Sequence, residues 1–301
     1  MKVLLTGGSG LIGSGLVQAL TAGGHGVVLL SRHGDASAAV PRYAWDARAG
    51  DPLPPAARGC DAVISLAGEN VAQRWTPGVR QLIRDSRIAG TRSLVEALAH
   101  SPPPWPRIFV SASATGFYGD CGDAQLSESS AAGSGFLADV CRDWEIAADA
   151  AGGLGMRVVK LRIGVVLDPR GGALAKMLPA FRLALGGPLG AGLQWMPWIH
   201  HQDLIGLLLT TLEKDLAGVY NACAPQPVRN QDFTRALGAA LRRPAHLRVP
   251  AFALRAIFGE MAWILLASQR VLPAATLAAG FQFQHPEIGA ALRHLLPGRL
   301  A

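Results

Sequence analysis

The chain has 301 residues, of which 50% are hydrophobic and 16% are charged, which is enough for a sizeable core. No apolar run approaches the roughly 18 residues that a membrane-spanning helix needs, so we expect no membrane role. The four cysteines show no metal-ligand spacing, and no export signal precedes the first apolar run. We therefore expect a cytoplasmic protein with reduced thiols and no metal site.

The net charge of +7 is unevenly distributed along the chain. Residues 1–150 contain 12 Lys and Arg against 14 Asp and Glu, whereas residues 151–301 contain 16 against 7. The C-terminal half either attracts an anionic ligand or reflects an arginine-rich composition, since 24 of the 28 basic residues are Arg. Aromatic residues do not alternate with the basic ones, so we do not expect nucleic-acid binding.

Short apolar runs alternate with helical segments through the first two-thirds of the chain. The predicted strands cover residues 1–5, 27–30, 62–67, 107–111 and 157–161, with helices at about 11–20, 77–100 and 136–151. Runs rich in Val and Ile fit a parallel sheet buried on both faces. Their alternation with helices predicts an α/β fold with a Rossmann-type doubly wound parallel sheet.

The pattern changes at about Gly171. A turn-rich segment at 186–190 precedes a helix for which Asp203 is a plausible N-cap, and further helices are predicted over 230–241 and 251–267. We therefore predict a nucleotide-binding domain over 1–170, its sheet completed by later segments. A smaller, mostly helical substrate lobe is predicted over 171–301.

A glycine-rich fingerprint lies between the first strand and the first helix. Gly7 allows a tight turn, Gly10 lets a pyrophosphate approach the backbone, and Gly13 lets helix and strand pack closely. The free N–H groups at the start of the helix are suited to bind phosphate. The predicted dinucleotide contacts here are Gly7, Ser9, Gly10, Leu11, Ile12 and Gly13.

The end of the second strand predicts which dinucleotide is bound. NAD enzymes place a carboxylate there for the ribose 2′-hydroxyl, and NADP enzymes place an arginine nearby for the 2′-phosphate. Here no carboxylate occurs before Asp35, while Ser31 offers a hydroxyl and Arg32 a planar cationic fork. We predict NADP(H) rather than NAD(H); the alternative is that Arg32 is a solvated loop residue.

Several motifs together resemble one family. The chain resembles an extended short-chain dehydrogenase/reductase, specifically the subgroup described as "NAD-dependent epimerase/dehydratase" or "epimerase family protein", through Leu66-Ala67-Gly68, Arg74-Trp75, Ser111 to Gly119 and Trp198-Ile199-His200. Its tail, at about 248–297, is similar to the C-terminal domain of unknown function of that subgroup, for example at Phe258-Gly259-Glu260-Met261.

The resemblance implies further cofactor contacts. Leu66, Ala67 and Gly68 would pass beside the adenine-side ribose and the pyrophosphate, and Arg87 and the backbone near Val165 would approach the cofactor. For Arg87, a salt bridge with a neighbouring aspartate or a helix end is the alternative. The resemblance also implies a possible homodimer through the helices at 77–100 and 136–151.

Members of the larger family carry a Tyr-x-x-x-Lys pair, in which the lysine lowers the pKa of the tyrosine that exchanges a proton with substrate. None of the three tyrosines in this chain has a lysine four residues later. The resemblance places Phe136 at the tyrosine position and Val140 at the lysine position. Hydride transfer with a tyrosine acid is therefore not supported.

Replacement residues are few. Ser113 matches the position that orients a substrate oxygen, although it could instead bond local backbone, and Tyr118 could donate a proton without a lysine to tune it. Glu145 is more typical of an ion pair than of a general base. Candidate substrate-binding residues combine a cation, aromatic faces and an imidazole: Arg74, Trp75, Trp198 and His200. Alternatively, the tryptophans fill the interdomain core and His200 caps a loop.

Two functions follow from these residues. The first is an NADP(H)-dependent, epimerase-like oxidoreductase with altered catalytic residues, acting on a small substrate that is anionic or resembles a sugar nucleotide. The second is a non-catalytic NADPH-binding protein that senses redox state or serves as a scaffold.

Overall fold

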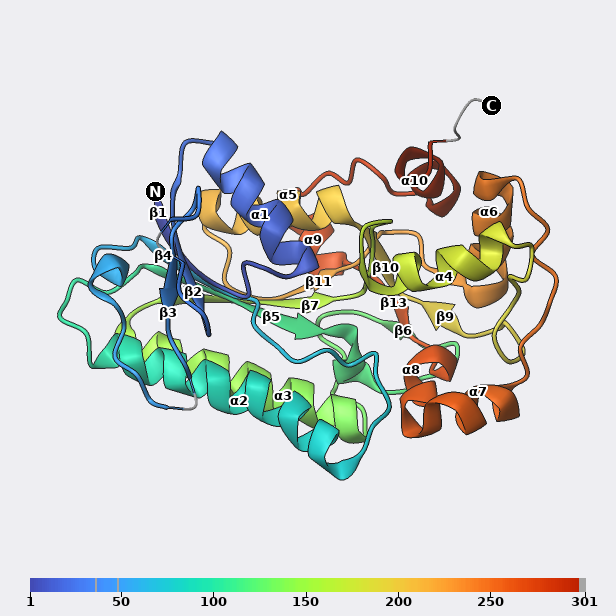
Figure 1. The fold of residues 1–301 in the computed structure, drawn as a ribbon, viewed down its shortest axis with the longest axis horizontal. Coiled ribbons are helices and arrows are strands. Elements are labelled where there is room, and N and C mark those ends of the chain that lie inside the picture. Colours follow the sequence, from blue (N-terminus) through green and yellow to red (C-terminus); the bar gives the residue numbers. More distant parts are fainter. Residues whose placement is uncertain (36, 48, 298–301) are drawn as a thin grey trace.

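The computed structural model describes residues 1–35, 37–47 and 49–297, and its main feature is one seven-stranded parallel sheet (Figure 1). The strand order is β11-β7-β5-β4-β1-β2-β3. The strands are β1 (Lys2–Thr6), β2 (Gly26–Ser31), β3 (Arg42–Ala44), β4 (Ala62–Ser65), β5 (Ile108–Ala114), β7 (Arg157–Ile163) and β11 (Gly218–Ala222). The predicted Rossmann-type fold is confirmed, and β11, which lies beyond residue 170, forms one edge of the sheet.

Helices cover both faces of the sheet. In Figure 1, α1 (Leu11–Ala22) and α5 (His201–Glu213) lie above it, and α2 (Pro77–Ala99) and α3 (Phe136–Asp149) lie below it. Along β1, Val3 and Leu5 pack with Leu16 of α1, whereas Leu4 packs with Leu94 of α2. Because successive strand residues point to opposite faces, an unbroken apolar run supplies two cores at once.

The remaining helices form a smaller lobe, on the right of Figure 1. They are α4 (Gly172–Arg182), α6 (Asn230–Leu241), α7 (Ala251–Phe258), α8 (Ala262–Leu266) and α10 (Ile288–Leu295), while α9 (Ala274–Ala278) contacts β11. Three short strand pairs join the parts: β8 (Val165–Leu167) with β10 (Trp198–His200), β9 (Trp195–Met196) with β12 (Val228–Arg229), and β6 (Gln125–Leu126) with β13 (Arg270–Val271). No helix among the described residues is both long and apolar enough to cross a membrane.

Two local predictions are wrong. The helix predicted over 251–267 is interrupted at Gly259, whose φ of 60° ends α7 before a single turn, η4 (Gly259–Met261), leads into α8. Asp203 is not an N-cap, because α5 begins at His201 and His200 accepts the capping hydrogen bond from the Gln202 amide. The Asp203 carboxylate instead accepts the backbone N–H groups of two residues of the C-terminal segment, Gln284 and His285.

Candidate functional site

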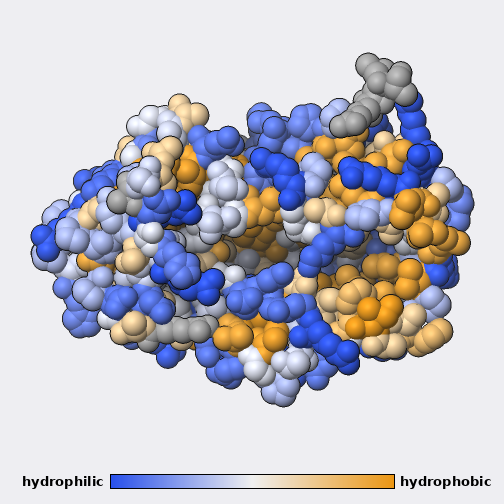
Figure 2. Space-filling model, in the orientation of Figure 1, coloured by the Kyte–Doolittle hydropathy of each residue, from blue (hydrophilic) through white to orange (hydrophobic). Residues whose placement is uncertain are grey.

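The carboxyl ends of parallel strands, where ligands of this kind of sheet bind, meet beside the N-terminus of α1. Figure 2 shows that the molecular surface is hollowed near the centre of this view, between the side of α1 and α5 and the side of α2 and α3. We refer to this hollow as the central cleft. Most of the residues predicted to bind the dinucleotide come from segments at this end of the sheet.

The glycine fingerprint has the geometry that its spacing predicts. Gly7 has a φ of 75°, and a Cβ at Gly13 would lie 2.2 Å from the Gly7 carbonyl oxygen, so helix and strand touch through backbone alone. At Gly10 the nearest atom to an added Cβ is 3.4 Å away, which leaves its outer side open. Ser9 and Gly10 are exposed, and Leu11 and Ile12 begin α1, where the first N–H groups have no partner within the helix.

The segment that follows β4 lies against this turn. A Cβ at Gly7 would meet the Leu66 carbonyl carbon at 2.7 Å and the Ala67 nitrogen at 2.8 Å. Next to them, the Arg87 guanidinium carbon lies 3.1 Å from where a Cβ of Gly68 would be. The structure therefore brings three separate parts of the sequence together: Gly7, the segment Leu66-Ala67-Gly68, and Arg87.

Arg87 is half-buried and has no carboxylate within salt-bridge distance among the described residues. Its Nη1 donates to the Ile83 carbonyl (3.2 Å), and the guanidinium lies 5.3 Å from the centre of the Trp144 ring. Burial lowers its pKa. The alternative of a pair with Asp85 does not occur, since that carboxylate accepts a hydrogen bond from Gln81.

In the loop after β2, the cation of Arg32 is exposed, whereas the carboxylate of Asp35 is paired. Arg32 is exposed, and no described carboxylate pairs with it. The Ser31 hydroxyl donates to the His33 carbonyl, which leaves its oxygen able to accept a further bond. Asp35 forms a salt bridge with Arg42 (3.1 Å), so its charge is already balanced.

Val165 lies in the short strand β8, and its amide donates to the Pro197 carbonyl (2.7 Å). The contact between this part of the chain and α1 is made by residues that were not predicted. A Cβ at Gly171 would lie 3.1 Å from the Leu11 side chain, and the His201 ring lies 3.2 Å from the Leu11 carbonyl oxygen. The residue before α4 and the first residue of α5 are thus in direct contact with the start of α1.

Ser113 and Tyr118 are parts of one buried cluster, the Glu145 network, formed with Glu145, Arg162 and Asn221. The Ser113 hydroxyl donates to Glu145 (2.7 Å), and Arg162 binds both oxygens of that carboxylate at 2.8 and 2.9 Å. Arg162 also donates to the Tyr118 hydroxyl (3.0 Å), which donates to the Asn221 side chain (2.7 Å).

The network fixes how these two hydroxyls can act. Tyr118 is fully buried, and burial raises its pKa to about 12. Ser113 is 3% exposed and already bonded. Their catalytic roles remain predictions, and in this conformation neither hydroxyl reaches the surface. At the far end of the network, the backbone N–H of Asn221 donates to the Glu128 carboxylate (2.9 Å). Its backbone carbonyl accepts from the Thr276 hydroxyl (2.9 Å).

Phe136, at the position that the resemblance gives to the catalytic tyrosine, is the first residue of α3. Trp75 meets its ring edge-on at 5.2 Å, and the Arg80 guanidinium lies 4.5 Å from the ring centre. Arg80 pairs with Glu260 (2.8 Å) of η4, and the exposed Arg74 lies beside Gly259. The C-terminal segment therefore reaches the loop that precedes α2.

Two of the predicted substrate-binding residues lie inside the second lobe. Trp198 is 1% exposed and packs with Phe233 in the hydrophobic core of this lobe, whereas the alternative interpretation placed it between the domains. His200 is also 1% exposed and stacks on His285, with ring centres 3.8 Å apart, while its Nε2 lies 3.2 Å from Nδ1 of His294. Neither side chain is exposed to a ligand.

His200, His285 and His294 form a group close enough to hold a metal ion, although the sequence predicted none. The Gln202 amide donates to Nδ1 of His200 (3.0 Å), so a neutral His200 carries its proton on Nε2. A metal ligand must be unprotonated at the coordinating nitrogen and usually donates its other N–H. This hydrogen bond therefore favours a stack of histidine rings, with the His200 proton on Nε2, over a metal site.

We predict that the protein becomes less stable as the pH falls below about 6.5, the usual pKa of histidine. Burial and the neighbouring His285 and His294 lower the pKa of His200 to about 3. Below about pH 6.5, His200 therefore binds a proton in the unfolded chain but not in the folded chain. This difference lowers the free energy of unfolding by about 2 kcal/mol at roughly pH 5.

The measurement is urea denaturation at roughly pH 7.5 and pH 5. His200→Asn keeps a side chain that can cap α5 and should lose less stability between these pH values than the wild type. A variant at the exposed His33, changed to Asn, should lose as much as the wild type. Equal losses in all three proteins would contradict the prediction.

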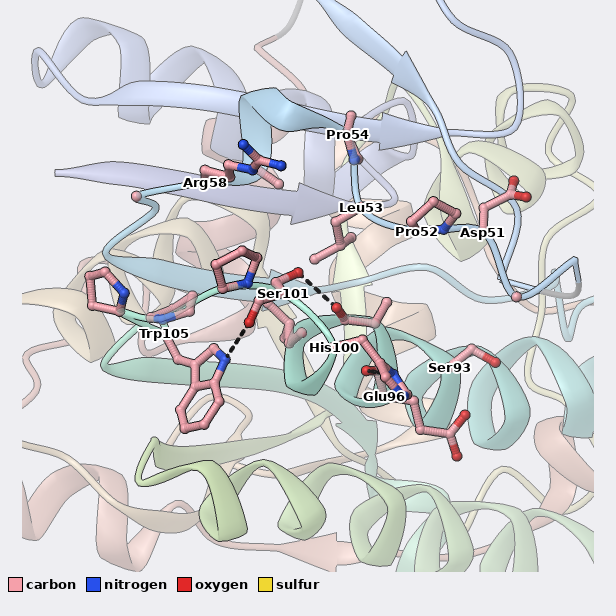
Figure 3. Close-up of a pocket in the computed structure, with 18 residues that line it drawn as sticks. Asp51, Pro52, Leu53, Pro54, Arg58, Ser93, Glu96, His100, Ser101 and Trp105 are labelled. Atoms are coloured by element: carbon pink, nitrogen blue, oxygen red, sulfur yellow. Dashed lines mark hydrogen bonds between the residues drawn. The ribbon is translucent and has the colours of Figure 1, made fainter.

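A cavity of about 420 Å³ lies away from the central cleft (Figure 3). It is bordered by the end of α2, the connector before β5 and the loop before β4, with Trp105 donating to the Ser101 carbonyl (3.1 Å). These segments precede their strands, so the cavity is at the amino-terminal edge of the sheet. No predicted site residue lines it.

Comparison with known proteins agrees with this geometry. A model of the NAD dependent epimerase/dehydratase family matches residues 3–223, and a domain of unknown function (DUF1731) matches residues 249–295. The chain is 43% identical to Epimerase family protein Mb2239 of Mycobacterium bovis. The 293 aligned residues cover 96% of each of the two chains.

Two solved structures are similar over nearly the whole chain. The human epimerase family protein SDR39U1 (isoform 2), crystallised with NADPH, has a TM-score of 0.89 at 39% identity and covers 99% of this chain and 100% of its own. A nucleoside-diphosphate sugar epimerase from Corynebacterium glutamicum has a TM-score of 0.80 at 36% identity, covering 100% of this chain and 59% of its own. The resemblance seen in the motifs is confirmed, and the chain belongs to the NAD dependent epimerase/dehydratase family.

Proposed function

We propose that the chain binds NADP(H) in the central cleft and acts as an epimerase-like oxidoreductase on a small anionic substrate. The observation that carries this proposal is the loop after β2, where Arg32 is exposed without a carboxylate partner and Asp35 is paired with Arg42. A ribose 2′-phosphate would find a planar cation and the Ser31 hydroxyl there, with no free carboxylate to repel it.

The remainder of the cleft fits a dinucleotide. The open side of Gly10 and the first N–H groups of α1 suit a pyrophosphate. Leu66 and Ala67, which lie against Gly7, would pass beside the adenine-side ribose and the pyrophosphate, and the Arg87 guanidinium beside Gly68 would approach the cofactor. The human relative SDR39U1 was crystallised with NADPH, which supports the choice of nucleotide. The bound nucleotide would supply hydride transfer, and Arg87 would hold an anionic group.

The substrate side is proposed to lie between the loop before α2 and η4. Arg74 and Trp75 offer a cation and an aromatic face there, which suits an anionic or sugar-nucleotide-like ligand. The relative from Corynebacterium glutamicum is a nucleoside-diphosphate sugar epimerase, which supports this class. Ser113 would orient a substrate oxygen, and Tyr118 or water would donate or accept the proton. Both hydroxyls would first have to exchange their hydrogen bonds within the Glu145 network for bonds to substrate.

A non-catalytic NADPH-binding sensor is the second candidate, and one observation favours it. Phe136 stands where the family's tyrosine is expected, and its ring is held by Trp75 and Arg80. No ionisable group at that position would exchange a proton with a substrate.

Titration of the purified chain with NADPH and NADH tests the nucleotide. We expect tighter NADPH binding, and we expect Arg32→Ala to weaken NADPH binding about tenfold while leaving NADH binding nearly unchanged, since one charge-assisted contact is lost. Tighter binding of NADH by the wild type would overturn the proposal. Consumption of bound NADPH over a panel of carbonyl compounds and sugar nucleotides then separates the enzyme from the sensor.

A further inference from the structure

The loop between β2 and β3 is closed by a clasp formed by Asp35 and Arg42. Their backbones exchange two hydrogen bonds, from the Asp35 amide to the Arg42 carbonyl (2.8 Å) and from the Arg42 amide to the Asp35 carbonyl (3.0 Å). Their side chains form a salt bridge of 3.1 Å. Backbone and charge therefore hold the same two residues together.

The clasp lies close to the end of β2. Ala44 of β3 is level with Ser31, and a Cβ at Gly34 would lie 3.2 Å from the Ala44 nitrogen. Asp35, next in the chain, bonds to Arg42 on the side of β3 that faces away from β2, so it lies about two strand spacings, or roughly 10 Å, from β2 and the residues at its end. This is near the screening length of about 8 Å at physiological ionic strength, so an unbalanced charge on Asp35 would act on an anion bound there.

Asp35 carries a full negative charge at neutral pH. Hydrogen bonds from the Ser37 hydroxyl (2.7 Å) and amide (3.2 Å), together with Arg42, lower its pKa. Both members of the salt bridge are about 40% exposed, at 42% for Arg42 and 39% for Asp35, and such pairs add little to folding stability. The main effect of the pair is therefore on the electrostatics of the neighbouring site.

We propose that Arg42 determines the choice between NADPH and NADH by acting through Asp35. It cancels the carboxylate charge that would repel a 2′-phosphate, and it keeps that carboxylate from accepting a hydrogen bond from a free ribose 2′-hydroxyl. Arg42 is thus a positioning residue, whereas Arg32 is the residue that contacts the phosphate. This inference rests on the proposed binding of NADP(H).

A double-mutant cycle on the full chain tests this role. Dissociation constants for NADPH and NADH are measured for the wild type, Arg42→Ala, Asp35→Ala and the double variant. Arg42→Ala should weaken NADPH binding about threefold to fivefold, as expected for an exposed like charge about 10 Å from a phosphate in screening salt. Removing Asp35 as well should restore NADPH binding to that of the wild type, because no charge then needs balancing.

The double variant, the ratio of the two dissociation constants and a control variant separate this inference from its alternatives. A double variant as weak as Arg42→Ala would mean that Arg42 touches the phosphate itself, which overturns the inference, as would an unchanged NADPH-to-NADH ratio in Arg42→Ala. Arg235→Ala, which breaks a more exposed surface pair with Asp232 (3.0 Å) on α6, is the control and should change neither constant. A wild type without NADPH preference would instead overturn the proposed function.

Discussion

Replacing Glu145 with alanine is expected to lower the free energy of unfolding by about 3–5 kcal/mol, because it leaves a buried guanidinium without its carboxylate. Arg162 donates to both oxygens of Glu145, and the two side chains are only 5% and 7% exposed. Ser113 would lose its acceptor as well. Urea denaturation of the wild type and the variant measures the difference.

A second ion pair on α3 provides the control. Asp139 pairs with Arg142 at 3.1 Å, but both side chains are nearly half exposed, so Asp139→Ala should cost less than about 1 kcal/mol. The double variant Glu145→Ala with Arg162→Met should be more stable than Glu145→Ala alone, because no uncompensated charge is then buried. If Glu145→Ala cost no more than Asp139→Ala, the importance of the network for stability would be refuted.

Replacing Gly13 with valine is expected to cost about 3 kcal/mol, at the upper end for overpacking a tight interior site. The added Cβ would lie 2.2 Å from the Gly7 carbonyl oxygen and 2.7 Å from the Gly8 Cα, both backbone atoms that cannot rotate away. The first turn of α1 must then move from β1, so the variant should also lose nucleotide binding. Thermal denaturation and NADPH titration measure the two effects.

Gly10→Ala separates binding from folding. Here the nearest atom to the new Cβ is the Gly7 oxygen at 3.4 Å, so the fold should accept the methyl group. The methyl group would nevertheless stand where a pyrophosphate must approach the backbone. We expect an unchanged melting temperature with weaker NADPH binding. Unchanged binding would mean that the nucleotide does not approach Gly10.

The sheet and the fingerprint could be predicted because their signals are local. The short apolar runs rich in Val and Ile in the first half of the chain form buried strands, and the spacing of Gly7, Gly10 and Gly13 describes one turn and one helix. The interrupted helix was missed because an isolated glycine inside a helical pattern usually does not end it. At Gly259 the chain takes a positive φ, which the pattern alone does not reveal.

The fate of the candidate side chains could not be predicted, because their partners are distant in the sequence. Tyr118 bonds Asn221, 103 residues later, and His200 lies against His294, 94 residues later. The sequence does contain one signal of the Glu145 network. Arg162 interrupts a run that must be buried on both faces, and a buried arginine requires a carboxylate nearby.

The bonds that Asn221 makes at the edge of the sheet have a consequence for self-association. An edge strand offers unpaired N–H and C=O groups to which a strand of another molecule can add. Asn221 is the fourth of the five residues of β11, and its backbone N–H and C=O are bonded to the side chains of Glu128 and Thr276. β3, at the opposite edge, is only three residues long. Both edges are thus poor templates for a further strand, which protects the sheet from edge-to-edge aggregation.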